Sequence, residues 1–192
     1  MKIGFVHAAE DLRSPISAIS LKKYQKIGVS VLAEKDALAN SDEDLTDKEG
    51  IEIVSKKDIL TNADIIYCNV PLKPADLKKL KKDAIVISFY APFNPVNMMD
   101  TLEGSEVKAF SMDMIPRTTL AQSMDVLSSM ASISGYKAVL LSAEKLPRYF
   151  PMMMTAAGTV KPAQVLILGA GVAGLQAIAT ARKLGAKVEV LM

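Results

Sequence analysis

The sequence predicts an α/β fold built on parallel sheets with helices on both faces. Half of its 192 residues are hydrophobic, which is enough for a sizeable core. Short apolar runs of strand length alternate along the chain with segments whose apolar residues recur at helical spacing. Strands that alternate with helices favour parallel pairing, because each connection has to return across the sheet.

The composition excludes several classes of protein. Disordered, collagenous and disulfide-rich chains do not combine 50% hydrophobic residues with a single cysteine. The 23 Lys and Arg residues are interleaved with 21 Asp and Glu residues, so nucleic acid is not an expected partner. The apolar stretch at the N-terminus is too short for a signal peptide, which predicts a cytoplasmic location. Residues 162–181 carry no charge, but they contain three glycines, so we expect a strand, a turn and a buried helix there and no membrane span.

The N-terminal part begins with an apolar strand over residues 2–8. A helix follows over residues 16–27, and Gly28 stops it. A strand at 29–33 precedes a charged stretch, 34–50, that is poor in large apolar residues and is expected to lie on the surface. The further elements are expected at 51–54 (edge strand), around 57–60 (helix), 64–70 (strand), around 75–80 (helix), 84–90 (strand), 95–102 (helix), 107–111 (strand), 122–132 (helix) and, past Gly135, 136–146 (helix). These elements predict a nearly complete flavodoxin- or Rossmann-like domain.

A boundary is expected where Pro147, Pro151 and Pro162 flank a segment unlike the rest of the chain. The methionines at 152–154 within it are expected to fill an apolar gap between two domains. A strand at 165–169, a helix at 172–184 and a strand at 187–191 then form one β-α-β unit. The expected organisation is an N-terminal α/β domain at 1–134, an interdomain helix and linker at 135–162, and the beginning of an incomplete Rossmann domain at 163–192.

A glycine motif lies between the strand and the helix of that unit. Gly169, Gly171 and Gly174 fit the pattern GxGxxG, with Val172 and Ala173 between the last two. The first glycine allows a tight turn, the second lets the backbone approach a diphosphate, and the third lets helix and strand pack closely. The free N–H groups at the start of the helix would face the anion. The motif in this context predicts binding of a dinucleotide.

The fingerprint also expects an acidic residue about 20 positions later, where it accepts hydrogen bonds from the ribose. Met192 stands at the end of the second strand, and Glu189 points to the opposite face of that strand. Two interpretations follow: the acid lies beyond the last residue, or adenosine binding is impaired.

A second polar group consists of Arg117, Gln122, Asp125 and Ser128. If Gln122 opens a helix, the last three lie along one helical face and offer amide, carboxylate and hydroxyl groups to a small polar ring. The alternative is a solvated helix start with Gln122 or Ser123 near the N-cap, and the spacing alone favours that alternative. His7 is expected at a strand end and Cys68 in a buried strand, so no metal site is expected.

Four segments closely resemble the NAD(H)-binding domain I of the alpha subunit of proton-translocating nicotinamide nucleotide transhydrogenase. They are residues 116–129, 135–139, 150–159 and 169–181, and the likeness is dense from about 117 to 186. The fold is shared with alanine dehydrogenase. The resemblance implies that Arg117, Gln122, Asp125 and Ser128 hold the nicotinamide end of NAD(H), with the first three as the catalytic group. It implies that the glycine turn, including Val172 and Ala173, takes the diphosphate.

The resemblance also implies partners for the chain. The hydride would pass to NADP(H) bound on a separate domain III, a membrane domain would couple the reaction to proton movement, and domain I would be a homodimer. The chain would then lie in the cytoplasm, held at the inner membrane through partner subunits, and would be inactive alone.

The sequence also departs from the family. Met192 stands where the family has its ribose-binding aspartate, and residues 11–15 are only loosely like the family's opening loop. Alanine dehydrogenase uses a Lys and a His in its first domain, and the corresponding regions, 67–71 and 88–92, contain neither. Transfer between two nicotinamides needs positioning rather than proton transfer. Two other functions stay open: an alanine dehydrogenase-like oxidoreductase, and a non-catalytic remnant that acts only as an association module.

Overall fold

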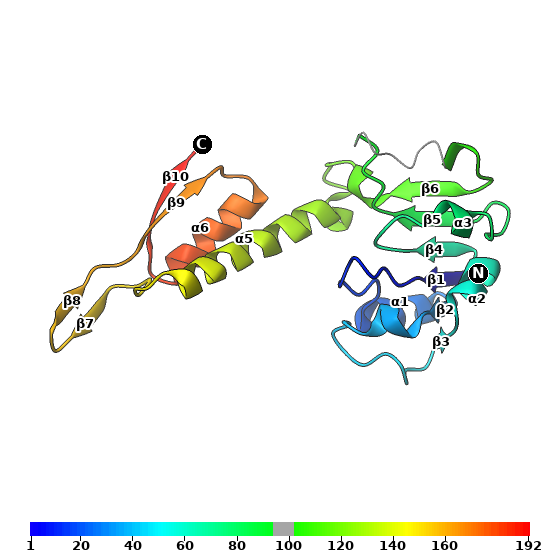
Figure 1. Cartoon of the computed structure of the whole chain (residues 1–192), viewed down its shortest axis with the longest axis horizontal. Helices are drawn as coiled ribbons and strands as arrows, with labels where there is room; N and C mark the ends of the chain where they lie inside the picture. Colours follow the sequence, from blue (N-terminus) through cyan, green and yellow to red (C-terminus); the bar gives the residue numbers. More distant parts are fainter. Residues whose placement is uncertain (94–101) are drawn as a thin grey trace. The chain divides into compact units, whose positions relative to one another are not determined.

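The computed structural model describes residues 1–93 and 102–192 and contains two compact units, Met1–Pro116 and Arg117–Met192 (Figure 1). The first unit is built on one six-stranded sheet in the order β3-β2-β1-β4-β5-β6, and every neighbouring pair is parallel. The parallel-sheet prediction is therefore confirmed, and the strand expected at 51–54 does lie at an edge. The strands are β1 (Lys2–Phe5), β2 (Ser30–Ala33), β3 (Ile51–Ile53), β4 (Ile65–Tyr67), β5 (Ile85–Ser88) and β6 (Lys108–Ser111).

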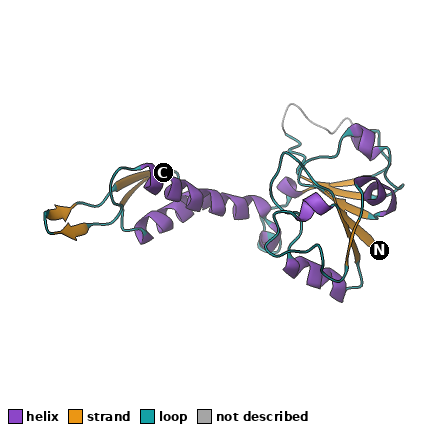
Figure 2. Cartoon of the chain, turned by 60° about the horizontal axis from the view of Figure 1, so that its bottom comes forward, coloured by secondary structure: helices purple, strands orange, loops and turns teal. Residues whose placement is uncertain are grey.

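Two hydrophobic cores lie on opposite faces of this sheet, because successive side chains of a strand point to opposite sides. In β2, Val31 belongs to the core that contains Leu21 of α1, whereas Leu32 belongs to the core that contains Ile59 of α2. Both faces are thus covered by helices (Figure 2). Helices in the described part of this unit include α1 (Ala18–Lys26), η1 (Lys35–Leu38), α2 (Lys56–Asn62), α3 (Pro74–Leu77) and η2 (Met112–Met114). The helix expected at 95–102 falls almost entirely outside the described residues.

The charged stretch at 34–50 is not a surface excursion throughout. Leu45 is fully buried and Leu38 nearly so, and both belong to the same core as Phe5. The burial of Leu38 and Leu45 was not predictable from the sequence, because a single leucine among polar residues in a loop shows no periodicity. The expectation that this stretch lies on the surface was therefore wrong for Leu38 and Leu45.

The second unit contains the predicted β-α-β arrangement. The strands β9 (Gln164–Leu168) and β10 (Lys187–Leu191) pair in parallel, and α6 (Val172–Lys183) connects them. Helix α5 (Val126–Lys145) packs against α6, and Val139 of α5 shares a core with Ala177 and Ala181 of α6. A 3₁₀ turn, η3 (Gln122–Met124), precedes α5.

One expectation for this unit was wrong, and one element was not predicted. The helices expected at 122–132 and 136–146 are one helix, α5, which begins at Val126 and continues through Gly135. The segment expected to be a linker contains an antiparallel hairpin of β7 (Met153–Thr155) and β8 (Gly158–Val160). The methionines at 152–154 are exposed within this unit.

Helix α5 is long and apolar enough to span a membrane by length and composition alone, which holds for no other helix in the described part of the chain. Core helices of soluble proteins also meet that criterion. In this unit α5 lies along α6, and the carbonyl of Ala173 leaves no room for a side chain at Gly135.

Candidate nucleotide-binding site

The glycine turn joins β9 to α6 in a conformation that only glycine adopts readily. Gly169 has φ of +92°, in the left-handed region that strains any residue with a side chain. A Cβ on Gly174 would lie 2.0 Å from the carbonyl oxygen of Gly169, so the third glycine is required by the close packing of helix and turn. A Cβ on Gly171 would meet nothing within 4 Å, so packing inside the unit does not explain the second glycine.

The N-terminus of α6 is open to an anion. Its N-cap is Gly171, which provides no side chain to accept from the first N–H groups, and the first turn holds no acidic residue. The first helical hydrogen bond runs from Leu175 N to Gly171 O at 2.8 Å. The preceding N–H groups, including those of Val172 and Ala173, have no acceptor inside the helix and point outward with the positive end of its dipole.

The N-terminus of α5 is closed by its own cap. Asp125 accepts the backbone N–H of Ser128 at 2.9 Å and its hydroxyl at 2.7 Å. These two bonds, with a smaller contribution from the charge of Arg117, hold the pKa of the Asp125 carboxyl below its usual value. Asp125 is therefore ionised at neutral pH, and it fixes the Ser128 side chain at the start of the helix.

These parts of the second unit meet at a hollow of about 360 Å³, which is within the size range of small-molecule sites. Arg117, Ser128 and the glycine turn all line it. Its full lining is Arg117, Leu127, Ser128, Ala131, Leu168, Gly169, Gly171, Val172, Ala173 and Gly174. One side thus presents a guanidinium and a hydroxyl, and the other presents free backbone N–H groups.

The structure places most, but not all, of the expected site residues at the hollow. Arg117 and Ser128 lie at the hollow with all five residues expected from the glycine turn. Asp125 is not part of the lining, but its carboxylate accepts a hydrogen bond from the hydroxyl of Ser128, which is. Gln122 is exposed in η3 and is not part of the lining. Gln122 does not open the helix, so Gln122, Asp125 and Ser128 do not share one helical face. The N-cap expected at Gln122 or Ser123 is at Asp125.

Three apolar lining residues were missed by sequence reasoning: Leu127, Ala131 and Leu168. Leu127 and Ala131 are separated by one helical turn, and Ala131 lies three positions after Ser128, so all three share a region of α5. Their spacing was visible in the sequence, but it could be used only once the start of α5 was known.

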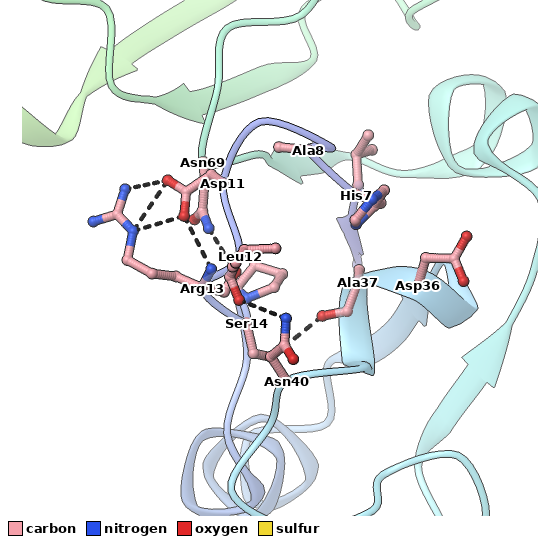
Figure 3. Close-up of a pocket in the computed structure, with 12 residues that line it drawn as sticks. His7, Ala8, Asp11, Leu12, Arg13, Ser14, Asp36, Ala37, Asn40 and Asn69 are labelled. Carbon is pink, nitrogen blue, oxygen red and sulfur yellow. Dashed lines mark hydrogen bonds and ion pairs between the residues drawn. The ribbon is translucent and has the colours of Figure 1, made fainter.

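The first unit has a smaller pocket, of about 10 Å³, at the loop that follows β1 (Figure 3). The Arg13 guanidinium is held there by the Asp11 carboxylate, with Nε 2.9 Å from Oδ1, and it lies 4.9 Å from the centre of the Phe89 ring. The Asn69 side chain donates to the Arg13 carbonyl at 2.8 Å. Arg13 lowers the pKa of Asp11. The guanidinium is thus already paired inside this pocket, which has room for about one water molecule.

His7 also lines this pocket, just past β1, and Cys68 is buried just past β4. Residues 1–93 and 102–192 contain no group of three or more His, Cys, Asp or Glu side chains that could hold a metal ion.

Comparison with known proteins gives consistent matches over nearly the whole chain. Residues 7–134 match the family model for the alanine dehydrogenase/PNT N-terminal domain, and residues 138–191 match that for its C-terminal domain. The chain is 38% identical over 184 residues to the first part of NAD(P) transhydrogenase subunit alpha of Rhodospirillum rubrum, covering 92% of this chain and 48% of that protein. It is 36% identical to NAD(P) transhydrogenase subunit alpha of Haemophilus influenzae, covering 98% and 38%.

Solved structures agree with these matches. A transhydrogenase from Sinorhizobium meliloti is similar with a TM-score of 0.87 and 38% identity, over 98% of this chain and 58% of that one. An L-alanine dehydrogenase is similar with a TM-score of 0.79 and 25% identity, over 99% and 54%. The chain spans about half the length of the curated relatives from Rhodospirillum rubrum and Haemophilus influenzae, or less.

Proposed function

Because this chain belongs to the alanine dehydrogenase/PNT family, we propose that it is the NAD(H)-binding component of a proton-translocating transhydrogenase. Its identity with transhydrogenase alpha subunits is 36–38%, against 25% with the alanine dehydrogenase structure. The observation that carries the proposal is the hollow of the second unit, where Arg117 and Ser128 lie across from the glycine turn.

The diphosphate of NAD(H) would rest on the glycine turn. The N–H groups of Val172 and Ala173 would donate to it, and the dipole of α6 would favour its negative charge. Gly171 supports this role, because the open space at its Cα would admit a diphosphate but would be narrowed by any side chain. Gly169 and Gly174 would keep the turn in shape.

The nicotinamide end would lie against the start of α5. Arg117 and Ser128 line the hollow there, Asp125 orients the Ser128 hydroxyl, and the family resemblance adds Gln122. Bound NAD(H) would supply the redox chemistry, with a hydride passing from NADH to NADP⁺ on a partner domain or from NADPH there to NAD⁺. Since neither reacting carbon exchanges a proton, these residues would act by holding the ring in position.

The partners follow from the same family. The relatives are named as alpha subunits, and we infer that this chain works as a homodimer with an NADP(H)-binding domain III and a membrane domain that moves protons. It would lie in the cytoplasm, peripheral to the inner membrane through those partners. Alone it would bind NADH without turning it over.

Titration of the purified chain with NADH, followed by dihydronicotinamide fluorescence, tests the proposal. We expect saturable binding that Arg117→Ala weakens ~10-fold, because a charge-assisted contact is lost. Lys137→Ala is the matched control, since it removes an exposed cation from α5 away from the hollow. Absence of saturable binding by the wild-type chain would reject the proposal in favour of a non-catalytic association module.

Alanine dehydrogenase activity is the second candidate, because both family models carry that name and the alanine dehydrogenase structure is similar over the whole chain. Reductive amination needs an ionisable acid or base beside the ring. Residues 67–71 and 88–92 provide no Lys or His for that role. We expect no reduction of NAD⁺ by alanine, measured at 340 nm; turnover would favour this candidate instead.

A further inference from the structure

Helices α5 and α6 lie side by side and run in the same direction (Figure 1). The first turns of both helices line the hollow, and further along Val139 of α5 packs with Ala177 of α6. The width of the hollow therefore depends on how closely the two helices approach each other.

Gly135 sets that approach. It lies in the middle of α5, where glycine is about 1 kcal/mol less favourable than alanine. A Cβ on Gly135 would lie 2.0 Å from the carbonyl oxygen of Ala173 and 3.1 Å from its Cα. Both of these are backbone atoms of the first turn of α6, which cannot rotate away as the end of a side chain could. Any residue other than glycine would push the helices apart.

The contact continues into the glycine turn. Gly174, next to Ala173, packs against the carbonyl of Gly169, so three backbone segments are stacked in order: α5, the first turn of α6 and the turn after β9. A hydrogen bond from the Ser132 hydroxyl to Gln176 Oε1, at 3.3 Å, ties the same two helices. Because the turn packs on α6 through Gly174, displacement at Gly135 would move α5 and its Ser128 relative to the turn.

We propose that Gly135 is a positioning residue for the nucleotide: it holds the Arg117 and Ser128 side of the hollow at the distance from the glycine turn that a dinucleotide spans. Gly135 does not line the hollow and acts through the placement of α5. This inference rests on the proposed function. It separates two classes of ligand, because ADP needs only the glycine turn, whereas NADH also needs the start of α5.

The test compares the dissociation constants of NADH and ADP for the wild-type chain, Gly135→Ala and Ser134→Ala. We expect Gly135→Ala to weaken NADH ~10-fold and ADP less than ~3-fold, since misplacement of one wall affects only the ligand that contacts both. Ser134→Ala is the matched control: it removes an exposed hydroxyl that donates to Met130 O within α5 and leaves the contact with α6 intact. It should change neither constant.

Each outcome has a distinct meaning. If the wild type binds NADH and Gly135→Ala binds it equally well, the inference is wrong and the proposed function stands. If Gly135→Ala weakens NADH and ADP by the same factor, its effect is a general loosening, and the inference is again wrong. If the wild type binds no NADH, both the inference and the proposed function are wrong. Circular dichroism checks folding, and if Gly135→Ala does not fold, Ser132→Ala decides: a selective loss of NADH affinity supports the inference, and unchanged NADH affinity overturns it.

Discussion

Asp125 is the residue on which the start of α5 depends. It caps the helix through Ser128, and Ser128 lines the hollow, so the helix cap and the wall of the hollow share one carboxylate. Its pKa is lowered mainly by the Ser128 hydroxyl and N–H. A carboxyl with a lowered pKa stabilises the fold above its unfolded pKa, and this contribution is lost as the pH falls through the folded value.

We therefore expect Asp125→Asn to lower the thermal unfolding midpoint at pH 7, and the difference from wild type to shrink as the pH falls below about 4. Asparagine keeps an N-cap acceptor without the charge, so the comparison isolates ionisation. Differential scanning fluorimetry between pH 7 and about pH 3 measures the two midpoints. A difference independent of pH would contradict this account of the cap.

Tyr90 gives a second effect at the residue scale, at alkaline pH. It is buried, and its hydroxyl has no hydrogen-bond partner among residues 1–93 and 102–192. Burial raises its pKa to about 12. The neutral phenol is thus favoured in the fold, so its contribution is complete below the unfolded pKa of about 10 and is lost as the pH rises toward 12.

Tyr90→Phe should be as stable as wild type or slightly more stable at pH 8, because the hydroxyl that is removed has no hydrogen-bond partner among the described residues. Its advantage should grow between about pH 10 and pH 11, where only the wild-type chain must keep this phenol protonated. Urea unfolding at the two pH values measures the change. The inference about Tyr90 would be wrong if the variant were markedly less stable at pH 8.

At the scale of elements, the strands of the two parallel sheets were predicted well, whereas the hairpin and the continuity of α5 were not. The strands of the six-stranded sheet are short apolar runs, and their alternation with helices was enough to predict parallel pairing. The hairpin of β7 and β8 was missed because each strand has only three residues, too few to show an alternation. The continuity of α5 was missed because Gly135 is a helix-stop signal when read alone. Gly135 is needed for the close contact with Ala173, which lies 38 positions later in the chain. No local sequence pattern reveals such a contact.

A substitution at Leu45 tests the loop between β2 and β3, whose partial burial was not predicted. It is fully buried in the core with Phe5 and Leu38, although it lies in the loop between β2 and β3. We expect Leu45→Ala to reduce the free energy of unfolding by about 2–5 kcal/mol, as for other leucines whose removal leaves a cavity. Leu12→Ala is the matched control, because the Leu12 side chain is 78% exposed. Equal effects of the two substitutions on urea unfolding would show that the loop is not part of the core.

At the scale of the whole molecule, the two units have different roles. The first has a six-stranded sheet with a core on each face, whereas the second contains the glycine turn and the start of α5. The glycine motif is a local pattern, whereas the group around Arg117 was expected only from the family resemblance, since its spacing alone favoured a solvated helix start. The apolar lining of the hollow and the place of Gln122 were not predictable, because they depend on where α5 begins.

This division predicts how NADH affects unfolding of the chain. A ligand present at ~100 times its dissociation constant stabilises the state that binds it by ~2.7 kcal/mol. Since each unit has its own core, we expect two calorimetric transitions, and NADH should raise only the one that belongs to Arg117–Met192. Leu45→Ala identifies the other transition by lowering it, and Arg117→Ala should reduce the NADH shift. If NADH instead raised only the transition that Leu45→Ala lowers, the nucleotide would bind to the first unit, and the hollow would not be its binding site.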